Sequence, residues 1–167
     1  RARENGAANI WIAVESVYSM DGDIAPLADL IETADRHDAY LIVDEAHATG
    51  IHGPGGKGFS AAYEGRDNLI ALHTCGKALG QAGALVTLPS VLKDYLINTA
   101  RSFIYTTAPT PLSAIAVQRA LEVVRDEPER RARLNDLAAH AHKTFGVGET
   151  QILPLLVGSD GDALALA

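Results

Sequence analysis

The strand expected over Leu41–Asp44 constrains the fold of this chain more than any other feature. Its three apolar residues stand side by side instead of alternating with polar ones. That pattern is typical of a parallel strand that helices cover on both faces. Strands and helices are expected to alternate around this segment. The pattern predicts a strand over 8–18, a helix from Pro26 to about His37, and further strands near 69–73 and 83–88. This order predicts an α/β fold with a mostly parallel sheet and helices on both faces.

The second half of the chain is expected to be mainly helical. A loop over 50–58 is too rich in glycine to be a helix. After it we expect a helix over 89–102, an extended piece over 103–107, helices from Pro109 to about 126 and from Pro128 onward, and a strand over 151–157. The helix that begins at Pro128 carries its apolar residues on one stripe, formed by Leu134, Leu137, Ala138, Ala141 and Phe145.

Composition excludes several classes of protein. The chain has 167 residues, of which 47% are hydrophobic and 21% charged, as in an ordinary globular domain. A formal net charge of −7 argues against a nucleic-acid or anionic-membrane surface. The single cysteine, Cys75, excludes an internal disulfide and fits a cytoplasmic protein. No apolar run reaches the roughly 20 residues of a membrane span, and the histidine spacing predicts no metal site.

Lys77 stands among small residues in Thr74–Gly80, 33 positions after Asp44. Asp44 ends one expected strand and Lys77 follows another, and ligands of open parallel sheets bind at the carboxyl ends of the strands. A lysine amine can hold an aldehyde cofactor as a Schiff base, while a carboxylate keeps the cofactor's ring nitrogen protonated. A carboxylate and a pyridinium about 3 Å apart attract each other by roughly 5 kcal/mol at an effective dielectric of about 20, before desolvation. The pair therefore predicts a pyridoxal phosphate site, provided that both side chains face one hollow.

Four segments resemble a known family. Glu15–Asp23, Val43–Gly50, His73–Gly80 and Phe103–Thr107 occur in the order and register of the α-oxoamine synthases, which are fold-type I pyridoxal phosphate enzymes. The resemblance implies a decarboxylative condensation of an amino acid with an acyl thioester. It favours the member that joins L-alanine to a pimeloyl thioester in biotin synthesis. The 5-aminolevulinate synthases, which use glycine and succinyl-CoA, and the 2-amino-3-ketobutyrate CoA ligases remain alternatives.

The resemblance also implies a role for each matching residue. Lys77 would be the Schiff-base lysine and the acid or base at the α carbon, and Asp44 would pair with the ring nitrogen. His47 and Ser19 would contact the phenolic oxygen of the ring. Thr74 would bind the cofactor phosphate. Thr106 or Thr107 would reach the phosphate bound by the partner subunit of a homodimer with shared active sites.

The resemblance covers about residues 8–157. It implies that residues 1–150 are the central part of a large cofactor domain, aspartate aminotransferase-like in fold, and that 151–167 begin a smaller carboxy-terminal domain. The family's glycine-rich phosphate loop, its ring-stacking side chain and its substrate-carboxylate contacts do not occur in this sequence. We therefore expect the chain by itself to be inactive.

Other interpretations compete with this one. Asp44 could cap the following turn, His47 could be structural, and Cys75 is better explained by packing than by nucleophilic catalysis. Residues 44–47 also spell the magnesium-binding motif of one group of helicases, but the partner phosphate loop is missing. The match of 53–58 to a dinucleotide fingerprint does not lie directly between a strand and a helix. A scaffold domain that has lost its chemistry is less consistent with the retained lysine, aspartate, histidine and serine.

Overall fold

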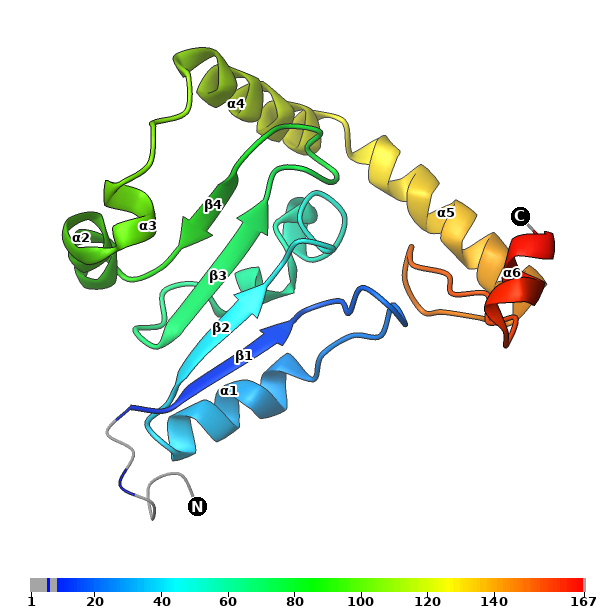
Figure 1. The fold of residues 1–167 in the computed structure, drawn as a ribbon, viewed down its shortest axis with the longest axis horizontal. Coiled ribbons are helices and arrows are strands. Elements are labelled where there is room, and N and C mark those ends of the chain that lie inside the picture. Colours follow the sequence, from blue (N-terminus) through cyan, green and yellow to red (C-terminus); the bar gives the residue numbers. More distant parts are fainter. Residues whose placement is uncertain (1–5, 7–8, 167) are drawn as a thin grey trace.

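The computed structural model describes residue 6 and residues 9–166. Its centre is a four-stranded sheet in the order β1 (Trp11–Glu15), β2 (Tyr40–Asp44), β3 (Leu69–Thr74) and β4 (Ala84–Thr87), shown in Figure 1. The first three strands are parallel, and β4 is antiparallel to β3. The expected α/β fold with a mostly parallel sheet is confirmed.

The hydrophobic core lies between this sheet and α1 (Leu27–Arg36). Leu41 and Val43 of β2 are fully buried, while Tyr40 and Ile42, which alternate with them, remain partly exposed. Successive side chains of a strand point to opposite faces, so the odd-numbered residues of β2 face α1. Burying each of these aliphatic side chains contributes roughly 1.5–3 kcal/mol. The core therefore fixes the register of β2, and with it the face on which the residues that follow will lie.

The remaining elements are mostly helical, as expected, with three differences in detail. Two short 3-10 helices, η1 (Pro54–Gly56) and η2 (Phe59–Tyr63), follow β2 within and beyond the glycine-rich loop. The expected helix at 89–102 is divided into α2 (Ser90–Thr99) and α3 (Arg101–Ile104), so the prediction of an extended piece beginning at Phe103 is wrong. Residues 151–157 form no strand, because no neighbouring strand pairs with them in the described part of the chain.

The carboxy-terminal half contains α4 (Pro111–Asp126), α5 (Pro128–Phe145) and α6 (Asp160–Leu166). Proline is favoured at the first position of α4 and α5 because an N–H at that position would have no acceptor within the helix, so its absence costs nothing. Gly146 ends α5 in the left-handed conformation, and its N–H donates to the carbonyl of His142. The apolar stripe of α5 is incompletely covered in the described structure, since Leu137 is 54% exposed and Phe145 63% exposed.

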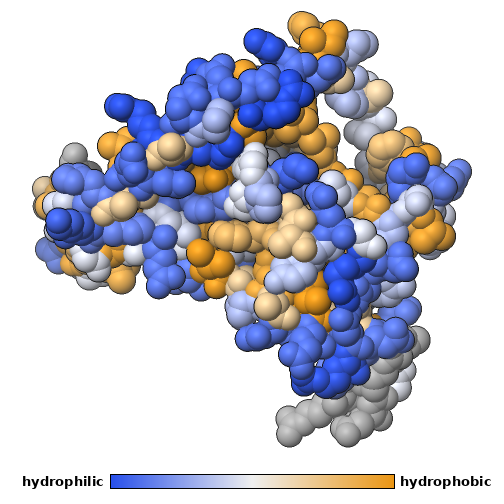
Figure 2. Space-filling view, turned by 180° about the vertical axis from the view of Figure 1, so that it is seen from behind, coloured by the Kyte–Doolittle hydropathy of each residue, from blue (hydrophilic) through white to orange (hydrophobic). Residues whose placement is uncertain are grey.

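Apolar side chains remain on the surface of α2, α3 and α4. Large exposed examples are Val91, Tyr95, Phe103, Leu112 and Ile115. Figure 2 shows such apolar patches on the back of the molecule, set among hydrophilic side chains. Contiguous apolar surface is typical of faces that another polypeptide covers. Among the described helices, none combines the length and the apolar character that crossing a bilayer demands.

Candidate cofactor site

The sequence-predicted residues of one subunit follow the carboxyl ends of three adjacent strands. Ser19 lies in the turn after β1, Asp44 and His47 lie at and just after the end of β2, and Thr74 and Lys77 lie at and just after the end of β3. Because β1, β2 and β3 are parallel, these ends meet at one edge of the sheet (Figure 1). Five predicted residues are thus brought to the same edge by the fold.

Lys77 occupies the connection between β3 and β4. The connection is closed by two backbone hydrogen bonds, from Cys75 N–H to the carbonyl of Gly83 at 2.9 Å and from Gln81 N–H to the carbonyl of Cys75 at 2.8 Å. Cys75 is buried beneath it, and burial raises the pKa of its thiol, which fits the packing role expected for this residue. Lys77 itself is exposed, so its amine is accessible to a ligand.

Asp44 is half-buried and already makes one local contact. Its Oδ1 accepts a hydrogen bond from the backbone N–H of Ala46 at 2.8 Å. The alternative role as a turn cap is therefore present in the structure. It does not exclude the cofactor role, because a carboxylate has two oxygens and about four acceptor positions.

Thr74 supplies a direct test of whether the site fits pyridoxal phosphate. Its hydroxyl oxygen is buried and has no hydrogen-bond partner among the residues that the structure describes. A buried polar group without a partner costs roughly 1–3 kcal/mol, so such groups are rare unless a ligand satisfies them. A phosphate oxygen is a strong acceptor for a hydroxyl donor. The position of Thr74 therefore fits the expected phosphate contact.

Glu45, which the sequence analysis did not single out, is fully buried beside Asp44. Its two carboxylate oxygens accept from Ser16 Oγ at 2.5 Å and from the backbone N–H of Ser60 at 2.5 Å. A Cβ atom at Gly58 would lie only 2.6 Å from the carboxyl carbon, so the loop can approach Glu45 only through a glycine. The alternation of side chains along β2 could have indicated this residue, since Leu41, Val43 and Glu45 point to the same buried face.

His73 extends this buried network on the face of β3 opposite to Thr74. The hydroxyl of Thr49 donates to the carbonyl of Glu45 at 2.8 Å, so it accepts from His73 Nδ1 at 2.9 Å. Burial lowers the pKa of His73 below its usual 6.5, although the carboxylates of Glu45, Glu64 and Asp44 act in the opposite direction. Burial thus favours the neutral imidazole, and the hydrogen bond to Thr49 assigns the proton of that form to Nδ1.

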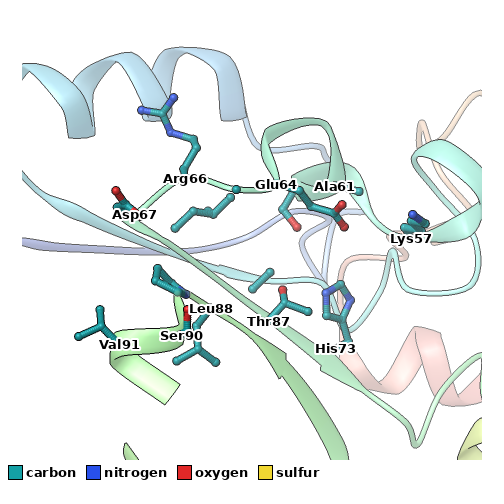
Figure 3. Close-up of a pocket in the computed structure, with 15 residues that line it drawn as sticks. Lys57, Ala61, Glu64, Arg66, Asp67, His73, Thr87, Leu88, Ser90 and Val91 are labelled. Carbon is teal, nitrogen blue, oxygen red and sulfur yellow. The ribbon is translucent and has the colours of Figure 1, made fainter. Parts of the chain in front are cut away.

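The hollows found among the described residues are lined by different parts of the predicted site. One hollow of about 580 Å³ is lined by His73, Lys57, Glu64 and Thr87, as Figure 3 shows, and neither Asp44 nor Lys77 lines it. A second, of about 650 Å³, includes Ala78 and Leu79 of the lysine turn and side chains of α4 and α5. Ser19 lines a third, of about 290 Å³, after β1. The convergence of Lys77 and Asp44 on one ligand thus stays a prediction.

Thr106 and Thr107 lie apart from the other predicted residues. Both are exposed, in the segment that joins α3 to α4. In Figure 1 this segment runs beyond β4, away from the end of β1. The two threonines therefore do not join the edge of their own subunit where Ser19 and His47 lie.

Comparison with known proteins identifies the family. A model of the aminotransferase class I and II family matches residues 1–154. The chain belongs to this family. Its membership rules against the interpretation of residues 44–47 as a helicase motif.

Similar proteins agree with the resemblance seen in the sequence. The chain is 46% identical to an 8-amino-7-oxononanoate synthase from Cupriavidus metallidurans, over 93% of this chain and 42% of that protein. It is 43% identical to a putative 8-amino-7-oxononanoate synthase from Geobacillus kaustophilus, over 94% of this chain and 43% of that protein. The expected likeness to the α-oxoamine synthases is confirmed, and the chain spans less than half the length of these relatives.

Solved structures lead to the same group. A serine palmitoyltransferase from S. paucimobilis, solved with bound PLP, superposes with a TM-score of 0.80 at 26% identity, covering 92% of this chain and 42% of that one. An 8-amino-7-oxononanoate synthase from Francisella tularensis superposes with a TM-score of 0.72 at 31% identity, covering 86% of this chain and 42% of that one. The fold is therefore that of the fold-type I enzymes.

Proposed function

We propose that this chain forms the cofactor-binding part of an 8-amino-7-oxononanoate synthase. The reaction would be the condensation of L-alanine with pimeloyl-CoA to give 8-amino-7-oxononanoate, CoA and CO2. The observation that carries the proposal is the buried, unpartnered hydroxyl of Thr74. Thr74 ends β3, which pairs with the strand that ends at Asp44, and the turn that holds Lys77 follows it in the sequence. The named relatives, at 41–46% identity, support the choice of reaction.

Each predicted residue has a task that its position permits. When bound, pyridoxal phosphate supplies an electron sink for charge that develops at the α carbon of the amino acid. Asp44 would hold a proton on the ring nitrogen through its carboxylate. Lys77 would hold the cofactor and move the α proton, while Thr74 would donate to the phosphate. Ser19 and His47 would contact the ring oxygen from the loops after β1 and β2.

We further propose that the enzyme is a cytoplasmic homodimer with shared sites. The apolar side chains on α2, α3 and α4 support an interface there, since they flank the segment that holds Thr106 and Thr107. In a symmetric dimer, that segment can complete the site of the other subunit, which explains its separation from the site of its own subunit.

The first test uses the complete gene product as wild type, Lys77→Ala and the matched control Lys93→Ala, an exposed lysine on α2. Wild type and the control should develop a visible absorption band with pyridoxal phosphate that borohydride makes permanent, and Lys77→Ala should not. Release of free CoA is then measured with L-alanine or glycine and a series of acyl thioesters. Absence of the band in wild type would refute the cofactor assignment, and preference for glycine with succinyl-CoA or for another pair would replace the proposed reaction.

The second test addresses the shared site. Inactive Lys77→Ala subunits are mixed with subunits that carry Thr106→Ala and Thr107→Ala together. If each site uses the lysine of one subunit and the threonines of the other, hybrid dimers contain one intact site, and activity should return to about a quarter of wild type after random exchange. No recovery after verified exchange would show that the threonines do not act across the interface.

A further inference from the structure

The segment that follows α5 contacts both loops that carry the predicted ring contacts. The hydroxyl of Thr150, a buried residue, donates to the carbonyl of Gly22 at 2.9 Å, in the loop just after Ser19. The side-chain amide of Gln151 donates to the carbonyl of His47 at 2.6 Å. These contacts join residues 128 and 104 positions apart in the sequence. Two neighbouring side chains therefore connect the loop after β1 to the loop after β2.

The orientation of Gln151 follows from its partners. A carbonyl can only accept a hydrogen bond, so the NH2 group of Gln151 must face His47. The amide oxygen then lies 2.6 Å from His52 Nε2 and must accept its proton. The imidazole of His52 is stacked on Phe59, with ring centroids 5.1 Å apart and planes 15° apart. Gln151 thus bonds to both ends of the 47–52 loop, and one of these ends is supported by packing.

Thr150 is held from the opposite side by α5. His142 Nε2 lies 2.8 Å from the carbonyl of Thr150 and donates to it. On the other side the approach to Gly22 is close, because a Cβ atom there would lie 2.6 Å from the carbonyl oxygen of Ile152 and 2.9 Å from the hydroxyl of Thr150. Gly22 also has a φ of +71°, which favours glycine. The contact therefore depends on a position that admits no side chain.

We infer that Thr150 and Gln151 are positioning residues, which hold Ser19 and His47 where they meet the cofactor ring. The inference rests on the proposed function and goes beyond it, because neither residue is among the predicted cofactor contacts and each acts on a loop that carries one of them. Ser19 is exposed and is held locally by one hydrogen bond, from its N–H to the carboxylate of Glu15 at 3.1 Å. Loops that carry binding groups bind more tightly when the surrounding structure fixes them in advance. The hydrogen bonds of Thr150 and Gln151 supply that fixation.

The test uses the complete gene product with Gln151→Leu and Thr150→Val, which keep approximate size and remove the hydrogen bonds. Thr150→Ser keeps the hydroxyl and serves as the rescue variant. Thr144→Val, at an exposed position on α5, is the matched control, because it also removes a threonine hydroxyl that donates to a backbone carbonyl. Amide hydrogen exchange over 19–23 and 46–52 is measured without cofactor. The dissociation constant of pyridoxal phosphate and the pH midpoint of its visible band are measured by titration.

We expect faster exchange in the 46–52 loop of Gln151→Leu and in the 19–23 loop of Thr150→Val. Cofactor binding should weaken about five- to tenfold in each, as expected for the loss of one or two hydrogen bonds, and the midpoint of the band should move. Thr150→Ser and Thr144→Val should match wild type in all three measurements.

Two outcomes would overturn the inference in different ways. If wild type binds the cofactor and both variants bind it equally well with an unchanged midpoint, Thr150 and Gln151 only stabilise the fold, and the proposed function stands. If wild type shows no cofactor band, the proposed function fails first, and the assignment of Ser19 and His47 as ring contacts fails with it.

Discussion

Replacing Glu45 by alanine should destabilise the protein far more than an average substitution. The change removes both acceptors of the buried network and leaves the hydroxyl of Ser16 and the N–H of Ser60 without partners, at sites that are 0% and 3% exposed. Each unsatisfied buried donor costs roughly 1–3 kcal/mol, and the cavity left by the side chain adds to this. We expect a loss of about 3–5 kcal/mol, a large part of the roughly 5–15 kcal/mol that stabilises a typical domain.

Glu45→Gln should be much milder, because the network can be remade. The amide oxygen can accept from the N–H of Ser60, and the amide nitrogen can donate to the hydroxyl of Ser16, which is able to accept. The cost should be about 1 kcal/mol, from the loss of a charge-assisted hydrogen bond.

Urea unfolding of the complete gene product, followed by circular dichroism, measures these differences through the midpoint and slope. The exposed residue Glu64 provides the control, and Glu64→Ala should stay within about 0.5 kcal/mol of wild type. A Glu45→Ala protein within about 1 kcal/mol of that control would refute the account of the network. So would a glutamine variant as unstable as the alanine variant.

Two other predictions concern Thr74 and His73. Thr74→Val removes the unpartnered buried hydroxyl, so the cofactor-free protein should melt at the same temperature as wild type or higher. Pyridoxal phosphate should bind about tenfold more weakly in equilibrium dialysis. Unchanged affinity would exclude a contact between Thr74 and the phosphate. Because burial lowers the pKa of His73 in the folded state, the unfolded chain takes up the proton first as the pH falls below about 6.5, and the free energy of unfolding should decrease there. His73→Asn, which can still donate to Thr49, should flatten this dependence in urea titrations between pH 7 and 5; an unchanged slope would assign it to other groups.

The sheet was largely predictable from sequence because its signals are local. The signals are the continuous apolar run of β2, Pro26 directly before α1 and Pro128 at the start of α5. Each determines the structure of only the residues next to it, and the elements predicted from them are close to those observed. The two wrong strand assignments, at 103–107 and 151–157, have a common cause. Phe103 and Ile104 have side chains typical of strands, and so do the residues of 151–157, yet a strand also needs a partner, which a local pattern does not supply.

The site was predictable only in part, for a related reason. Asp44 and Lys77 follow strands, so the rule for parallel sheets brought them to one edge. The hydrogen bonds that hold the site loops in place could not be predicted from strand order. Gln151 reaches His47 across 104 residues and Thr150 reaches Gly22 across 128, and neither contact leaves a periodic signal. The alternation of side chains along β2 could have indicated Glu45, but its partners Ser16 and Ser60 come from two distant segments, the loop after β1 and the helix η2.

The connection that carries Lys77 is tied to the sheet at both ends. It leaves β3 and returns as β4, and the paired strands continue into the bond between Cys75 and Gly83. A side chain mounted on such a hairpin cannot shift far unless two strands slide past each other and break their ladder. Under the proposed function, acyl thioesters of different size would have to be accommodated by movement elsewhere, so changes that broaden the acyl range should be sought outside the hairpin.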